Sequence, residues 1–143
     1  SVAPSQFDGD EALSGAETCN RPRFVLSDVL DPDCLKDGGR FDIFLSNPPY
    51  VRESEKALMS RNVLDWEPGL ALFVPDGDPL RFYRAEAALA ARLLSPGGFG
   101  LVEINEAYGR EVAGLFRDAG FRDPEVLKDL SGRDRFVLFS AER

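Results

Sequence analysis

The pattern of apolar and polar positions predicts an α/β domain from residue 23 onward. Apolar runs at residues 23–28, 41–46 and 99–105 have the length and composition of buried strands. Two later segments repeat apolar residues at helical spacing: Leu80, Tyr83, Ala87, Ala90 and Leu94, then Val112, Leu115, Phe116 and Ala119. Strands that alternate with helices are typical of a mostly parallel sheet with helices on its faces.

Local signals set the expected boundaries of these elements. Asp78 followed by Pro79 predicts a helix N-cap and first turn, and Gly120 predicts the end of the second helix. Residues 124–141 predict two antiparallel strands joined by a turn at Ser131 and Gly132. The run at 41–46 is apolar enough to predict burial on both faces.

The first 22 residues form a poorly organised segment, and residues 23–143 form the domain. Prolines and glycines interrupt any periodicity before residue 23, although residues 10–19 are compatible with a short helix. Residues 51–77 form a long polar-to-mixed stretch between two elements. Connections of that length inside a compact domain usually carry function.

The composition excludes several kinds of chemistry. The 143 residues contain no histidine, which removes Ser-His-Asp and Cys-His catalysis. Cys19 and Cys34 lack the spacing of a metal site, so we expect no metal and a reducing, cytoplasmic compartment. No apolar run approaches membrane-spanning length. A formal net charge of −8 argues against a dedicated nucleic-acid binder.

The strand at 41–46 is followed directly by Asn47-Pro48-Pro49-Tyr50, a segment that cannot continue the pairing of a sheet. Prolines lack the N–H that a strand ladder needs, and they hold the preceding residues extended. Their carbonyls and the Asn47 side chain form a stiff set of acceptors beside an aromatic ring. These groups suit a planar NH2 group, whose two hydrogens are accepted while Tyr50 stacks on it. A rigid structural turn is the alternative interpretation.

Other polar residues fall at the carboxyl ends of strands, where α/β sheets bind ligands. Asp28 either contributes to such a site or caps a turn. Glu103 either lines the pocket or caps the next helix, and capping is the favoured interpretation. Gly97, Gly98 and Gly100 precede a strand, which predicts a turn rather than a phosphate loop.

Five stretches resemble one family of enzymes in order along the chain: "NPPYV", "DWEPGLALF", "LSPGGFGLVEI", "AGF" and "KDLSGRDRFVL". The sequence is similar to the catalytic domain of release-factor glutamine methyltransferases of HemK/PrmC type. The resemblance implies a Rossmann-like class I methyltransferase fold and S-adenosylmethionine as cofactor. It also implies methylation of the glutamine amide in the Gly-Gly-Gln motif of class-1 peptide chain release factors.

The same resemblance assigns the site residues. It implies that Asn47, Pro48, Pro49 and Tyr50 bind the substrate amide, with Asn47, Pro48 and Tyr50 acting in catalysis. Asp28, Val29 and Asn47 would contact the cofactor. Glu67 matches the family's Glu-Pro, and we expect it to shape its loop.

The chain also departs from the family, because the Gly-rich loop after the first strand has no counterpart. We therefore expect a partial domain, with N-terminal strands missing and with an exposed sheet edge that favours self-association. Two alternatives stay open. The first is an adenine-specific DNA or RNA methyltransferase, whose substrate amine fits the same Asn47–Tyr50 corner at the end of the strand. The second is a non-catalytic fragment. We expect no direct nucleic-acid or membrane partner.

Overall fold

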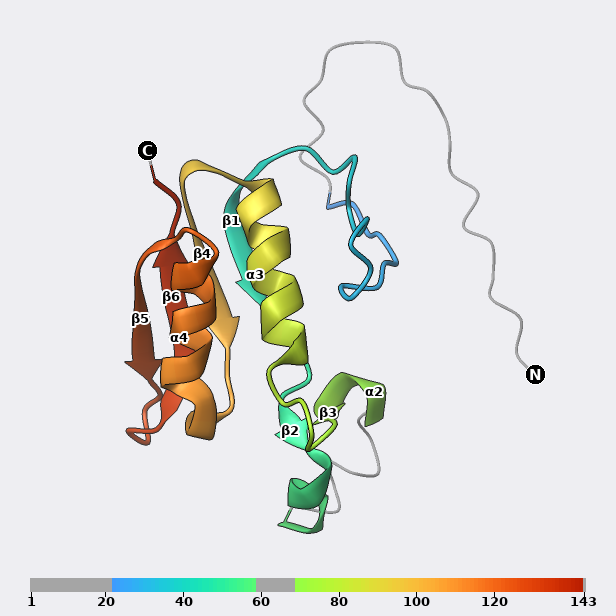
Figure 1. Cartoon of the computed structure of the whole chain (residues 1–143), viewed down its shortest axis with the longest axis vertical. Coiled ribbons are helices and arrows are strands. Elements are labelled where there is room, and N and C mark those ends of the chain that lie inside the picture. Colours follow the sequence, from blue (N-terminus) through green and yellow to red (C-terminus); the bar gives the residue numbers. More distant parts are fainter. Residues whose placement is uncertain (1–21, 59–68, 143) are drawn as a thin grey trace, which may run out of the picture.

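The computed structural model describes residues 22–58 and 69–142 (Figure 1). The segment 1–21, with its expected short helix, and Glu67 lie outside the described residues. The elements, in chain order, are β1 (Phe41–Ser46), β2 (Val51–Arg52), the 3-10 helix η1 (Glu53–Leu58), α2 (Gly69–Leu72), β3 (Phe73–Val74), α3 (Arg81–Leu93), β4 (Leu94–Glu103), the 3-10 helix η2 (Glu106–Tyr108), α4 (Gly109–Asp118), β5 (Arg122–Lys128) and β6 (Asp134–Ser140).

The main sheet has four strands in the order β1-β4-β6-β5. β1 and β4 are parallel, whereas β6 is antiparallel to both β4 and β5. The predicted C-terminal hairpin is therefore confirmed, and it joins the sheet through β6. A separate parallel pair, β2 and β3, matches Val51 with Phe73. The described residues have an α/β arrangement, as predicted, and their main sheet is mixed, with one parallel and two antiparallel strand pairs.

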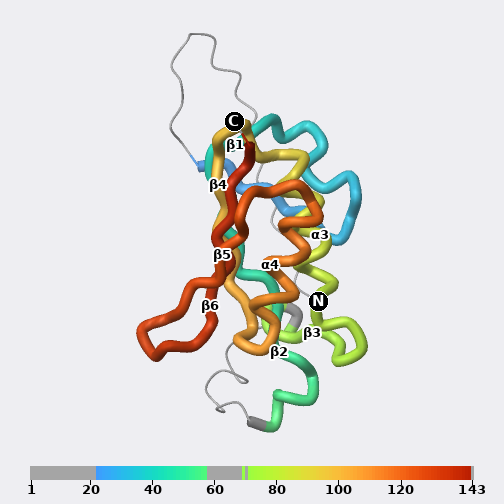
Figure 2. The backbone as a smooth tube through the Cα atoms, turned by 60° about the vertical axis from the view of Figure 1, so that its left-hand side comes forward, coloured from blue at the N-terminus to red at the C-terminus, as the bar shows by residue number. Residues whose placement is uncertain are grey.

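Helices α3 and α4 cover the same face of this sheet (Figure 2). The core lies between them and the strands, where Tyr83, Phe116 and Phe139 are fully buried. The Phe116 and Phe139 rings stack with centroids 4.0 Å apart. The helical stripes predicted from sequence form this packing, because their residues recur on the side that faces the sheet.

The strand predicted at residues 23–28 is wrong. These residues form no regular structure up to Ser27, and a turn begins at Val29. The side chains of Phe24 and Leu26 are 92% and 104% exposed. A strand is held by its partner's hydrogen bonds, and none of the described strands pairs with this segment.

Burial of β1 on both faces is also wrong. β1 pairs only with β4 among the described strands. Phe44 packs into the core, whereas Ile43 and Leu45, which point to the opposite face, are 53% and 70% exposed. Phe99 on β4 shares this uncovered apolar face. The self-association expected from such a surface stays a prediction.

Asp78 does not cap the helix as predicted. α3 begins at Arg81, and its N-cap residue, Leu80, makes no side-chain cap bond. The Asp78 carboxylate instead accepts a hydrogen bond from Arg84 at 2.5 Å, and Pro79 lies in the turn that precedes the helix. An ion pair with the helix itself has replaced the expected capping bond.

Gly100 allows β4 to pack against an aromatic ring. A β-carbon at Gly100 would lie 2.2 Å from the Phe139 ring, which is itself 1% exposed. We expect Gly100→Ala to lower the free energy of unfolding by about 1–3 kcal/mol, because the stacked rings have no room to move. Urea denaturation measures this change.

Gly114→Ala on α4 is the matched control. A β-carbon there meets nothing within 4 Å. Because alanine favours a helix over glycine, this variant should gain about 0.5–1 kcal/mol. Equal stability of Gly100→Ala and the unmodified chain would contradict the packing described.

Candidate functional site

The Asn47–Tyr50 corner lies where two parallel strands end side by side. Ser46, the last residue of β1, pairs in register with Val102, so that Asn47 follows β1 next to Glu103 at the end of β4. Pro48 is buried, whereas Asn47 is exposed. An open depression of about 380 Å³ adjoins the corner, and its lining consists of Leu45, Ser46, Asn47, Leu101, Glu103 and Phe136.

No described residue donates a hydrogen bond to the Asn47 side chain or to the carbonyls of Pro48 and Pro49. Asn47 is exposed and lines the depression, whereas Pro48 is buried. Within the described part of the chain, the Asn47 amide oxygen therefore keeps its capacity to accept an N–H donor from a ligand.

Tyr50 is fixed by its hydroxyl. This hydroxyl donates to Glu103 Oε1 at 2.5 Å, and Arg135 Nη1 lies 4.0 Å from the same oxygen. Burial, followed by the bond to Glu103, raises the pKa of Tyr50 to about 12. The Tyr50 hydroxyl is therefore neutral at physiological pH and continues to donate its hydrogen bond to Glu103. Arg135 also pairs with Asp129 at 3.3 Å, which connects the β5–β6 turn to the corner.

Glu103 does not cap the following helix, contrary to the favoured interpretation. It is the last residue of β4, lines the depression and accepts the Tyr50 hydroxyl. Asn105 is the cap, because its Oδ1 accepts the Ala107 N–H at 3.0 Å. The amide of Asn105 fits this position better, since it can accept from the helix and still donate elsewhere.

Asn105 is a site residue that sequence reasoning missed. Its Nδ2 donates to the Tyr50 carbonyl and to Glu55 Oε2, both at 3.1 Å. Burial works to raise the pKa of Glu55, but hydrogen bonds from Arg52 lower it overall, so this acceptor is ionised. The signal available in the sequence was an asparagine placed directly between a strand and a helix.

Helix α3 contacts the chain at the carboxyl ends of β1 and β4 through two hydrogen bonds. The Tyr83 hydroxyl accepts the backbone N–H of Asn105 at 3.2 Å. One turn later, Glu86 Oε1 accepts a hydrogen bond from the Ser46 hydroxyl. Glu86 is only 3% exposed, and burial raises its pKa to about 7. The sequence did not reveal this carboxyl, which interrupts an alanine-rich helix.

The structure places Asp28 and Val29 apart from this network. Asp28 Oδ1 accepts the Leu30 N–H at 2.9 Å, which is the turn-capping alternative. Val29 is half-buried against Cys34, Leu89 and the rest of that small apolar cluster. It also lines a hollow of about 830 Å³. The contact of Asp28 and Val29 with a cofactor stays a prediction.

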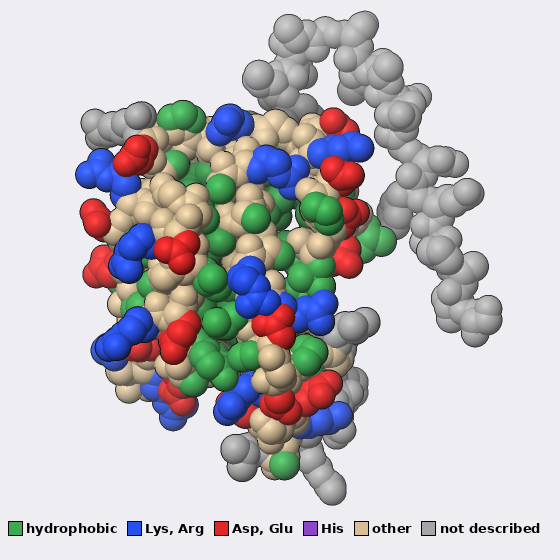
Figure 3. Space-filling view, in the orientation of Figure 1, with side chains coloured by type: hydrophobic (Ala, Val, Ile, Leu, Met, Phe, Trp, Pro, Cys, Tyr) green, Lys and Arg blue, Asp and Glu red, His purple; other side chains and the backbone are tan. Residues whose placement is uncertain are grey.

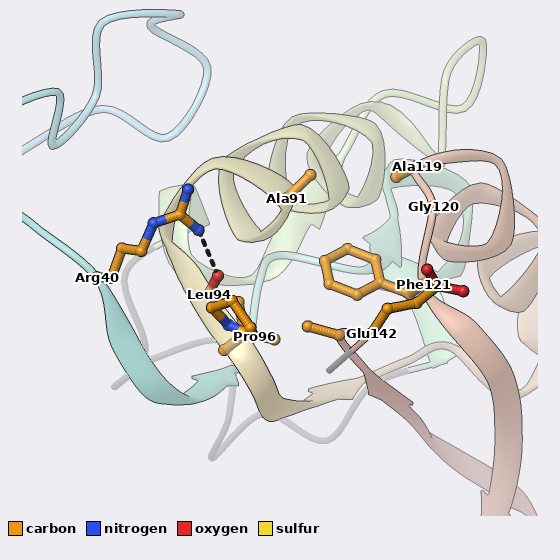
Figure 4. Close-up of a pocket in the computed structure, with 9 residues that line it drawn as sticks. Arg40, Ala91, Leu94, Pro96, Ala119, Gly120, Phe121 and Glu142 are labelled. Atoms are coloured by element: carbon orange, nitrogen blue, oxygen red, sulfur yellow. Dashed lines mark hydrogen bonds between the residues drawn. The ribbon is translucent and has the colours of Figure 1, made fainter.

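Two other features do not form a site. No group of metal-binding side chains occurs in residues 22–58 and 69–142. A pocket of about 210 Å³ lies at the opposite end of β4 (Figure 4). In this pocket Arg40 donates to the Leu94 carbonyl at 2.9 Å, while Ala91 and the ring of Phe121 contribute only apolar surface. Of its two charged lining residues, Arg40 and Glu142, Arg40 already donates to a backbone carbonyl, which leaves few polar groups to orient a ligand.

Comparison with known proteins identifies one set of relatives. No family model matches the sequence. Release factor glutamine methyltransferase of Bacteroides thetaiotaomicron is 52% identical over 133 residues, which cover 90% of this chain and 48% of that protein. The Flavobacterium psychrophilum protein of the same name is 43% identical over 114 residues, which cover 80% of this chain and 39% of that protein.

A solved structure, that of protein-(glutamine-N5) methyltransferase (release factor-specific) from Alicyclobacillus acidocaldarius, is 26% identical to this chain. The match covers 74% of this chain and 82% of that one, with a TM-score of 0.41.

The chain spans about half of the Bacteroides relative and less of the Flavobacterium relative. The resemblance first seen in the corner and the "DLSGRDR" turn is confirmed over most of this sequence. The chain is therefore similar to a part of the release factor glutamine methyltransferases.

Tyr50→Phe tests the hydrogen bond that holds the corner. Removing the hydroxyl leaves Glu103 without its donor, so we expect a loss of about 1 kcal/mol in the free energy of unfolding. Tyr108→Phe is the matched control, because no hydrogen bond of the Tyr108 hydroxyl occurs among the described residues. Urea unfolding distinguishes the two variants, and an equal change in both would contradict the Tyr50–Glu103 bond.

The buried Glu86 predicts a specific pH dependence of stability. In the folded chain the pKa of Glu86 is raised to about 7, whereas in the unfolded chain the carboxyl has its ordinary pKa of 4.5. The resulting stabilisation is full below the unfolded pKa and is lost as pH rises through 7. It amounts to at most about 3 kcal/mol.

Urea unfolding between pH 5 and pH 8 measures this loss. Glu86→Gln should remove it, since glutamine does not titrate. Glu111→Gln on α4, at an exposed position, makes the same chemical change and should preserve the loss. An identical slope in the Glu86 variant would show that another group is responsible.

Proposed function

We propose that this chain contributes to methyl transfer from S-adenosylmethionine to the side-chain amide nitrogen of a glutamine. The glutamine is the one in the Gly-Gly-Gln motif of class-1 peptide chain release factors. The observation that carries the proposal is the row of acceptors at Asn47, Pro48 and Pro49, to which no described residue donates, beside the anchored ring of Tyr50. The names of the relatives support the same substrate.

The corner would act on the amide by positioning it. Asn47 Oδ1 and the proline carbonyls accept both N–H bonds, which favours a more pyramidal nitrogen and directs its lone pair outward. Such positioning contributes several kcal/mol, up to about 7–11 in the best intramolecular cases. The same carbonyl dipoles stabilise the positive charge that develops on nitrogen during the attack.

Tyr50 would complete the clamp without taking a proton. Its ring packs against the flat face of the amide, and its bond to Glu103 keeps the ring in place. The methylated nitrogen becomes acidic and releases its proton afterwards, so a histidine-free site is sufficient. This sequence of events needs acceptors and orientation rather than a general base.

The residues that would hold the cofactor are Asp28, Val29 and Asn47. When bound, S-adenosylmethionine supplies a methyl group on a positively charged sulfur, which is the electrophile. The hollow of about 830 Å³ that Val29 lines is large enough to admit an adenine ring, and its wall combines apolar side chains with charged ones such as Asp33 and Lys36. Among the described residues, no glycine-rich turn leads from a strand into a helix to hold the methionine part.

The charge distribution favours a protein substrate over a nucleic acid. On the face in Figure 3, Lys and Arg side chains alternate with Asp and Glu, without a continuous basic stripe. In the described ranges, no helix has the length and apolar character needed to cross a membrane. A cytoplasmic location agrees with the proposed substrate and with the free, buried Cys34.

Methyl transfer to a class-1 release factor tests the proposal. The chain is incubated with S-adenosylmethionine carrying a labelled methyl group, and incorporation into the Gly-Gly-Gln glutamine is followed by mass spectrometry. We expect Asn47→Ala to reduce turnover by about 100-fold or more, because it removes an acceptor that acts on the transition state. Because Asp28 and Val29 would still hold the cofactor, calorimetry should show a much smaller change in cofactor affinity than in turnover.

Three controls separate the alternatives. Glu111→Gln should retain the activity of the unmodified chain. Methylation of an adenine-containing oligonucleotide instead of the release factor would support the adenine-specific alternative. Absence of both transfer and cofactor binding would support the non-catalytic alternative and overturn the proposal.

A further inference from the structure

Glu86 is buried directly beneath the proposed amide-binding corner. The side chain is 3% exposed and comes from α3, on the side that faces the sheet. Its Oε1 accepts the hydroxyl of Ser46, the residue that immediately precedes Asn47. A displacement of Glu86 therefore acts on the last residue of β1 and, through one peptide bond, on the first residue of the corner.

The second oxygen of this carboxyl has no partner. Glu86 Oε2 is buried and receives no hydrogen bond from the described residues. A buried polar atom without a partner costs free energy, and a buried charge without a counter-charge costs more. Structural reinforcement of Ser46 alone does not require an ionisable group at this position, because an amide would accept the same hydroxyl.

The groups around Glu86 offer no positive charge. On α3 its neighbour is Tyr83, and β1 provides the Ser46 hydroxyl. Tyr50 and Glu103 lie at the strand ends and carry no positive charge. Both of them, like Glu86, raise the pKa of Tyr83. From α4, the shared core receives Val112, Ala113 and Phe116, which are apolar. Burial raises the pKa of Glu86, and the hydrogen bond from Ser46 lowers it, which leaves a pKa of about 7.

We propose that Glu86 is a positioning residue for the Asn47–Tyr50 corner, which it supports through the Ser46 hydroxyl, and that ionisation of the carboxyl changes this support. The Ser46 hydroxyl donates to Oε1 in either state and binds the ionised form more strongly. Oε2 has no partner among the described residues, so ionisation leaves it with a buried, unpaired charge. The corner is therefore held differently in the two protonation states.

The titration of the free protein tests this proposal without any substrate. The signals to follow by NMR are the Glu86 carboxyl carbon, the Ser46 backbone amide and the Asn47 side-chain amide, between pH 5.5 and 8.5. We expect all three to change with one midpoint near pH 7. In Glu86→Gln the Ser46 and Asn47 signals should stay constant, whereas in Glu111→Gln they should titrate as in the unmodified chain.

The opposite results are equally clear. Constant Ser46 and Asn47 signals in the unmodified chain would overturn the proposal, even if Glu86 itself titrates. The same titration of these signals in Glu86→Gln would also overturn it. A purely structural Glu86 would change stability in the variant but would not transmit a titration to Asn47.

The consequence for substrate binding rests on the proposed function. The affinity for a peptide containing Gly-Gly-Gln should differ between pH 6 and pH 8, by on the order of 10-fold if only one protonation state of Glu86 supports binding, because affinity follows the fraction of the competent form. Glu86→Gln should bind it equally at both pH values. A peptide that binds no variant at any pH would count against the proposed function, and the titration of the free protein would still decide the role of Glu86.

Discussion

Two consecutive prolines end β1, and the candidate site depends on this constraint. Neither Pro48 nor Pro49 has an N–H, so the ladder with β4 stops at Ser46, and no described residue donates to the two proline carbonyls. Because β4 is parallel to β1, its own end lies alongside. Within the described residues, the result is a set of available acceptors at the edge of the sheet where α/β proteins bind ligands.

A buried polar network gives this corner its rigidity. Asn105 bonds to the Tyr50 carbonyl, Tyr83 accepts from Asn105, and Glu103 accepts the Tyr50 hydroxyl. Each of these contacts joins segments that are far apart in the sequence. The corner is therefore positioned by the packing of α3 against the sheet as much as by its own prolines. Substitutions beneath the corner should act on it without touching a ligand.

The sequence predicted the elements whose formation is local. The stripes of α3 and α4, the C-terminal hairpin and the proline corner follow from periodicity or from backbone restriction within a few residues. Residues 23–28 have the composition of a strand but form none, because pairing depends on a partner elsewhere. Asp78 has the position of a cap but pairs with Arg84. Glu86 and Asn105 acquire their roles only when the helix and both strand ends come together.

The proposed function requires the corner to grip both hydrogens of a planar NH2 group. The most direct measurement uses a Gly-Gly-Gln peptide with a 15N-labelled glutamine side chain, titrated with the chain and observed by NMR. We expect saturable shifts of both amide protons, with cross-relaxation to the Tyr50 ring, that disappear in Asn47→Ala. Shifts that persist undiminished in that variant, or amide protons that never respond, would contradict it.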